Sequence, residues 1–223
     1  TVVDGSPLEM LQLSLGYKDK TRIGFYISNL IEQTRKRTST PETRIYDLAV
    51  LLHCKTIDPI ATYMKYDEQK VEILGTALFK EDKMVGDLNV TDTGILHALM
   101  GKKTNFSYYY RENSNDVKSG IAFLFRKLKR KVEIDTSASV PKINIKLDFA
   151  ATLEEYDSRH HLDDPKIKEE LEKIVSEAMK NECMRILAYL QEVGSDPIGF
   201  GEMFRSKYND YYKTIDWRKV YPD

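Results

Sequence analysis

The segment from residue 164 to residue 201 decides the fold, and it reads DPKIKEELEKIVSEAMKNECMRILAYLQEVGSDPIGFG. Asp164 and Pro165 have the order of a helix N-cap followed by proline at the first helical position. Apolar residues then recur at three- and four-residue steps as far as Leu190, which predicts an amphipathic helix. Gly194 is the expected end, because glycine adopts the left-handed conformation that closes many helices. The segment predicts one helix over about residues 165–193, with a long apolar stripe that must lie against another element.

A predicted sheet upstream of this helix supplies a matching apolar surface. Its strands alternate apolar with polar residues, and the apolar positions are Ile121, Phe123, Phe125, Ile143, Ile145, Leu147 and Phe149. Alternation with a period of two is typical of an antiparallel sheet that has one buried and one solvated face. We therefore expect the long helix to pack on this sheet.

The first half of the chain mixes helical and strand patterns. A helix is predicted over residues 20–36, and a second from Thr40 and Pro41, with Ile45, Leu48, Ala49 and Leu52 on its buried side. Residues 71–79 and 84–86 predict a β-hairpin, Thr91 is the expected cap of a short helix, and residues 104–111 predict a strand. His97 on the short helix is expected at the surface or the core boundary.

These patterns predict an α+β fold with two lobes, each a mainly antiparallel sheet packed with helices. The polar run from Arg111 to Asp116 is the likeliest seam. We assign residues 1–113 to one domain and residues 114–223 to a second, which the long helix covers.

Composition limits the class of function. The 34 basic and 35 acidic residues give a net charge of -1, which argues against nucleic acid as a partner. No run approaches the roughly 20 apolar residues of a membrane span. Cys54 and Cys183 are predicted to be buried thiols without a disulfide.

One basic cluster leaves two interpretations open. It consists of Arg126, Lys127, Lys129, Arg130 and Lys131. Such charges at the solvated end of a sheet discourage edge-to-edge pairing. They also suit a surface that faces anionic lipid.

No catalytic, cofactor or metal site is predicted. His160 and His161 lie among aspartates, but no third ligand stands at a recognisable metal-binding spacing. The glycines from Gly194 to Gly201 follow a helix and lack the Lys-Ser/Thr pair of a phosphate-binding loop. Nucleophile motifs such as G-x-S-x-G are absent from the sequence.

Two segments resemble a known family. Residues 75–88 read GTALFKEDKMVGDL and are followed by LMGK at residues 99–102. Gln191 is followed by DPIGFG at residues 196–201 and then by Phe204, Tyr208 and Trp217. Together they resemble the GerAC-type lipoproteins, the C subunits of nutrient germinant receptors in endospore-forming bacteria. The resemblance extends over nearly the whole chain.

The resemblance implies a non-enzymatic, lipid-anchored protein on the outer face of the spore inner membrane. It would act in nutrient-triggered germination through contacts with two integral membrane subunits, A and B. The family's lipidated cysteine and N-terminal domain match nothing here, and Cys54 and Cys183 do not correspond to that cysteine. Because the chain opens at Thr1, we expect it to be a fragment that lacks both. The family chain also usually continues past the tryptophan tail.

The residues that match the family motifs are expected to serve architecture first and partner contact second. They are Gly75, Gly86, Asp196, Gly199, Phe200, Gly201 and Trp217. Glycines there permit tight backbone paths, and the aromatic residues pack. The alternative function is an extracytoplasmic module that binds a small ligand in a cleft between the lobes.

Overall fold

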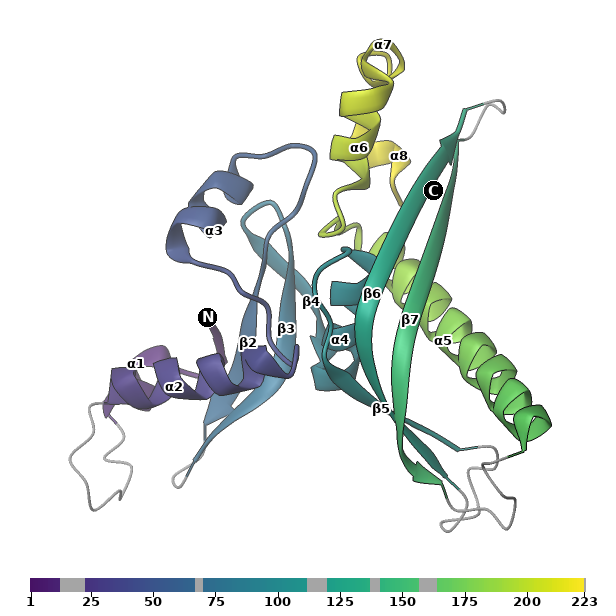
Figure 1. Ribbon diagram of the computed structural model, residues 1–223. Helices are drawn as coiled ribbons and strands as arrows, with labels where there is room; N and C mark the ends of the chain where they lie inside the picture. Colours follow the sequence, from purple (N-terminus) through teal and green to yellow (C-terminus); the bar gives the residue numbers. More distant parts are fainter. Residues whose placement is uncertain (13–22, 67–69, 112–119, 137–140, 157–163, 223) are drawn as a thin grey trace.

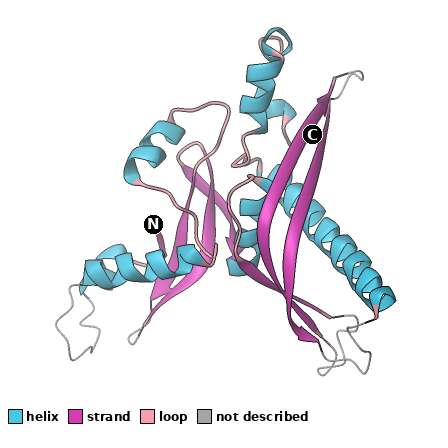
Figure 2. Ribbon diagram, in the orientation of Figure 1, coloured by secondary structure: helices cyan, strands magenta, loops and turns pink. Residues whose placement is uncertain are grey.

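The fold contains two sheets and eight helices among the described residues, which are 1–12, 23–66, 70–111, 120–136, 141–156 and 164–222 of a computed structural model (Figure 1). Helices and strands are mixed, as Figure 2 shows, so the predicted α+β class is confirmed. The first sheet has the order β1-β2-β3-β4, with only β1 and β2 parallel. Its strands are β1 (Val2–Asp4), β2 (Ile60–Tyr66), β3 (Val71–Lys80) and β4 (Lys83–Asn89).

The second sheet is fully antiparallel and has the order β5-β6-β7. Its strands are β5 (Phe106–Tyr110), β6 (Ile121–Asp135) and β7 (Lys142–Tyr156). The predicted hairpin and strands therefore form, and β5 belongs to the second sheet. The predicted domain boundary at 113/114 lies outside the described residues, as does most of the polar seam.

Helices α1 (Pro7–Gln12) and α2 (Ile23–Lys36) lie beside the first sheet, and α3 (Ile45–Leu52) follows them (Figure 1). The predicted start of the second helix at Thr40 is wrong, because Arg44 is the N-cap of α3. Thr40 is instead fully buried, 3.3 Å from the Thr34 hydroxyl. The predicted buried side of α3 is also wrong, since Ile45 is 88% exposed.

Helix α4 (Val90–Leu99) lies between the two sheets and is almost wholly buried. Its cap is Asn89, whose side chain accepts a hydrogen bond from the Asp92 N–H, and not Thr91. His97 is only 4% exposed, which corrects the expected position at the surface or core boundary. A hydrophobic helix in this position links the cores of the two lobes.

Helix α5 (Pro165–Val193) confirms the predicted long helix. The Asp164 side chain accepts from the Lys166 N–H, and Gly194 closes the helix in the left-handed conformation at φ 66°. Its C-terminal half packs on α4 through apolar residues that include Ile186 and Leu190. The chain ends in three short helices, α6 (Phe200–Lys207), α7 (Asn209–Tyr212) and α8 (Trp217–Val220).

Two apolar clusters hold the molecule together. The larger one runs from β2, β3 and β4 through α4 to β6, α5 and the aromatic tail. The smaller one joins Met10, Met64 and Val71 to the inner side of α2. Of the helices in the described part of the chain, none has the length and hydropathy that crossing a membrane requires.

Candidate functional site

The turn from Gly194 to Gly201 is built around the carboxylate of Asp196. Oδ1 accepts hydrogen bonds from the N–H groups of Gly199 at 2.8 Å and Phe200 at 3.1 Å. Oδ2 accepts from the Gly201 N–H at 2.8 Å and from the Trp217 indole at 3.1 Å. Burial raises the pKa of Asp196 to about 6, against these four donors, which lower it. Because internal donors occupy both oxygens, the carboxylate serves the turn and not a ligand.

The same turn is tied to the first sheet. The Asp196 N–H donates to Oδ2 of Asp58 at 2.8 Å, and the Asp58 N–H donates back to the Asp196 carbonyl at 3.0 Å. The Ser195 hydroxyl donates to the Phe79 carbonyl at 2.7 Å. The turn therefore connects the C-terminal tail to the first lobe.

Three of the motif glycines allow close approach of other groups. A Cβ at Gly201 would lie 2.6 Å from the Trp217 Nε1 and 2.8 Å from the Thr56 carbonyl oxygen. A Cβ at Gly86 would collide with the Tyr189 hydroxyl of α5. A Cβ at Gly75 in β3 would lie 2.1 Å from the Leu88 carbonyl oxygen, and Gly199 is the residue before α6.

The basic cluster on β6 divides into two parts. Arg126, Lys127, Lys129 and Lys131 are exposed, and Lys127 occupies a bulge in the strand at φ 48°. Arg130 instead points to the C-terminal end of α4, where its Nη1 donates to the Leu99 carbonyl at 2.6 Å. A guanidinium there also interacts favourably with the helix dipole. Only the exposed part of the cluster is available to a membrane surface.

Helix α3 presents an apolar surface that the sequence pattern did not indicate. Ile45 is 88% exposed, Tyr46 75% and Val50 51%. No residue of α3, all of which are described, is buried. A helix that is apolar on nearly all sides usually lies in a core. That composition was the signal in the sequence for an unusual position of α3.

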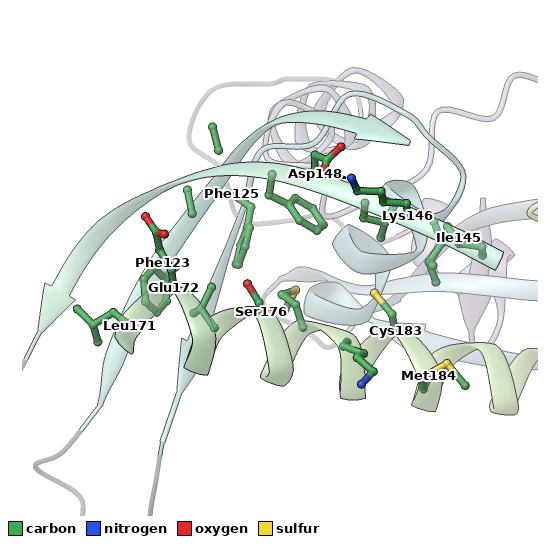
Figure 3. A pocket seen from close by; sticks show the side chains of 18 of the residues that line it. Phe123, Phe125, Ile145, Lys146, Asp148, Leu171, Glu172, Ser176, Cys183 and Met184 are labelled. Carbon is green, nitrogen blue, oxygen red and sulfur yellow. Dashed lines mark ion pairs between the residues drawn. The ribbon is translucent and has the colours of Figure 1, made fainter. Parts of the chain in front are cut away.

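A groove separates α5 from the second sheet, and Figure 3 shows side chains from both walls pointing into it. We call it the sheet–helix groove; its volume is about 1010 Å³. Its sheet wall includes Phe123, Phe125, Ile145, Leu147 and Phe149. Its helix wall includes Leu171, Val175, Met179, Cys183 and Leu187. The expected direct packing of helix on sheet is therefore incomplete, and the groove lies within the second lobe instead of between the lobes.

The remaining candidates are metal ligands and thiols. The described residues contain no group of three His, Cys, Asp or Glu side chains that could hold a metal ion. His160 and His161 lie outside the described residues. Both cysteines are free, and Cys54 is only half-buried, which corrects the prediction of a buried thiol. Burial raises the pKa of the Cys183 thiol to about 11, so it is protonated at neutral pH.

Comparison with known proteins identifies relatives in bacterial spore germination. A family model described as "Spore germination B3/ GerAC like, C-terminal" matches residues 74–223. The spore germination protein GerQC of Bacillus cereus is 23% identical over 206 residues, which cover 92% of this chain and 56% of GerQC. The crystal structure of GerBC aligns with a TM-score of 0.70 at 19% identity, over 81% of this chain and 57% of that one. The chain thus spans little more than half the length of either relative.

Proposed function

This chain belongs to the GerAC-like family of spore germination proteins, and from that premise we propose that it is part of the C subunit of a nutrient germinant receptor. The subunit acts without catalysis, by holding the integral membrane A and B subunits through protein contacts. In the full-length protein a lipid anchor places it on the outer face of the spore inner membrane.

The observation that carries this proposal is the exposed apolar face of α3. Ile45, Tyr46 and Val50 would be costly to leave in water, because each buried apolar side chain gains about 1.5–3 kcal/mol relative to exposure. Arg44 flanks the face and is largely exposed. Tyrosine and arginine are enriched among the residues that contribute most of the binding energy at protein interfaces. We assign this face, Ile45, Tyr46 and Val50, to contact with a membrane subunit.

A second contact, with the membrane itself, is proposed for the exposed residues of β6. Arg126, Lys127, Lys129 and Lys131 project from the outer side of the sheet. Lys131 pairs with Glu133 at 2.6 Å, so its charge is partly neutralised. Each lysine or arginine near an anionic surface contributes about 1 kcal/mol. A single acyl chain anchors a protein only marginally, and such a patch would strengthen it.

The test is site-specific photocrosslinking in spores that carry the full-length protein. A photoreactive residue at Tyr46 is expected to crosslink to an integral membrane subunit of the receptor. The matched control is Asp210 on α7, which is fully exposed and distant in the fold from α3. Mass spectrometry of the crosslinked product identifies the partner.

The functional test measures germination of spores that carry the Ile45→Lys variant of the same protein. We expect slower nutrient-triggered germination with an unchanged amount of the protein in the membrane fraction. Two results together would show that α3 is not the contact surface. They are equal crosslinking at Tyr46 and Asp210, and normal germination of the Ile45→Lys spores.

A further inference from the structure

Strand β7 leaves one edge of the second sheet open. It pairs with β6, and no other strand in the described part of the chain pairs with its outer side (Figure 1). The ladder with β6 runs from Lys142 to Leu153 without an extra residue in β7, because one bulge falls at Lys127 of β6 and the next at Glu154. A long regular edge presents a row of N–H and C=O groups to which another strand can pair.

This strand lacks the common features that protect a sheet edge from pairing. Such features include proline, bulges and charged side chains that point toward the core. β7 contains no proline, and from Lys142 to Leu153 the side chains on its inner face are all apolar. The half-buried ones are Ile143, Ile145, Leu147, Phe149 and Leu153. A strand added at this edge would therefore cover apolar surface in addition to pairing with the backbone.

The sequence of β7 is complementary to itself in the antiparallel direction. When Leu147 lies opposite Leu147 of a second copy, Lys146 of each copy lies opposite Asp148 of the other on the outer face. On the inner face, Ile145 of each copy then lies opposite Phe149 of the other. Opposite charges and aromatic–aliphatic pairs directly across two strands stabilise the pairing. The two-fold symmetry of such a contact makes each of these pairs occur twice.

The neighbouring registers are less favourable. A slide by two residues in either direction sets Lys146 opposite Lys146 or Asp148 opposite Asp148, and like charges directly opposite each other are destabilising. A slide by one residue sets the apolar face of one strand against the polar face of the other. Lys146 and Asp148 are exposed, and they lie 3.7 Å apart within one strand. The charges thus favour the register centred on Leu147, in which the paired stretch from Lys142 to Thr152 is about 34 Å long at 3.4 Å per residue.

We propose that a second copy of this chain binds at the β7 edge, so that two antiparallel β7 strands centred on Leu147 join the second sheets of both copies into one. The strand order of the joined sheet is β5-β6-β7-β7-β6-β5. On its inner face, Phe149 of each copy covers Ile145 of the other. This edge is separate from the α3 surface in the first lobe, so the dimer can be tested whether or not the receptor assignment holds.

The experiment is sedimentation velocity of the 223-residue protein over a range of micromolar concentrations. We expect a reversible dimer. Lys146→Glu and Asp148→Lys should each weaken dimerisation at least about tenfold, because each reversal turns two attractive pairs into two repulsive ones. Lys173→Glu is the control, since it makes the same change of charge at an exposed position of α5 away from the edge. This control should dimerise like the unmodified protein.

An equimolar mixture of the Lys146→Glu and Asp148→Lys variants tests the register itself. In a mixed dimer the two reversed charges face each other, and the unchanged Lys146 faces the unchanged Asp148, so both pairs are attractive again. We expect the mixture to dimerise about as well as the unmodified protein, and circular dichroism of each variant verifies its fold. A monomeric unmodified protein, single variants that dimerise as well as the control, or a mixture that stays as weak as its components would each overturn the proposal.

Discussion

Phe200 shows how a motif residue can be assigned to the core or to an interface. Its ring is 4% exposed and lies 6.4 Å from the ring of Tyr221. We expect Phe200→Ala to lower the free energy of unfolding by about 3–5 kcal/mol, because truncation leaves a cavity. Phe25→Ala on α2 is the matched control, since Phe25 is 62% exposed and should cost less than about 1 kcal/mol. Denaturant unfolding measures both. Similar midpoints for Phe200→Ala and the unmodified protein would show that the ring does not stabilise the core.

His97 gives the protein a pH-dependent stability. Burial, and then the charge of Lys102, lower its pKa from 6.5 to about 4, and its Nε2 has no hydrogen-bond partner among the described residues. The unfolded chain therefore binds a proton between pH 6.5 and pH 4 that the folded chain does not, so stability falls as the pH falls through this window. From pH 7 to pH 5 the loss attributable to His97 should be about 2 kcal/mol.

His97→Gln isolates this effect, because glutamine has no charge to gain in that range. Unfolding free energies of both proteins at pH 7 and pH 5 give the comparison. The variant should lose about 2 kcal/mol less than the parent over the interval. Parallel pH dependence of the two proteins would show that His97 titrates normally in the folded state.

At the scale of elements, the backbone conformation of Gly194 determines where α5 ends. Gly194 adopts φ 66°, and alanine there should cost about 1 kcal/mol, since a Cβ is disfavoured in the left-handed region. Gly24 lies inside α2, and a Cβ there would meet nothing within 4 Å. Gly24→Ala should therefore stabilise by up to about 1 kcal/mol. Thermal melts of the two variants are expected to shift in opposite directions. A shift of the same sign would mean that backbone conformation at Gly194 is not what ends α5.

Local signals made some elements predictable and others not. Asp164, Pro165 and Gly194 mark the ends of α5 within the sequence, and alternation marks β6 and β7. Which side of α3 is buried depends on what packs against it, so the apolar pattern of α3 alone led to the wrong side. The groove depends on the separation of α5 from the sheet, which no periodicity encodes. The four donors around Asp196 likewise meet only when the turn and Trp217 come together.

At the scale of the whole molecule, the two lobes share one core. The larger apolar cluster contains Leu78 and Leu88 of the first sheet, Leu96 of α4 and Phe125 of the second sheet. Asp58 adds hydrogen bonds between the first lobe and the C-terminal turn. Elements that share buried surface in this way lose it together, which favours a single unfolding transition.

We therefore expect the fluorescence of Trp217, the single tryptophan, and the far-ultraviolet circular dichroism to report one coincident denaturant transition.

The α1–α2 region should differ, because it belongs to the smaller cluster of Met10, Met64 and Val71. Its amides should exchange with solvent by local opening at a lower free energy than those of α4 and α5.

Asp58→Ala should lower the midpoints of both spectroscopic probes together, since it weakens the junction on which both lobes depend. Two separated transitions in the unmodified protein would show instead that each lobe is stable without the other, and the shared core would then be an interface between independently folding domains.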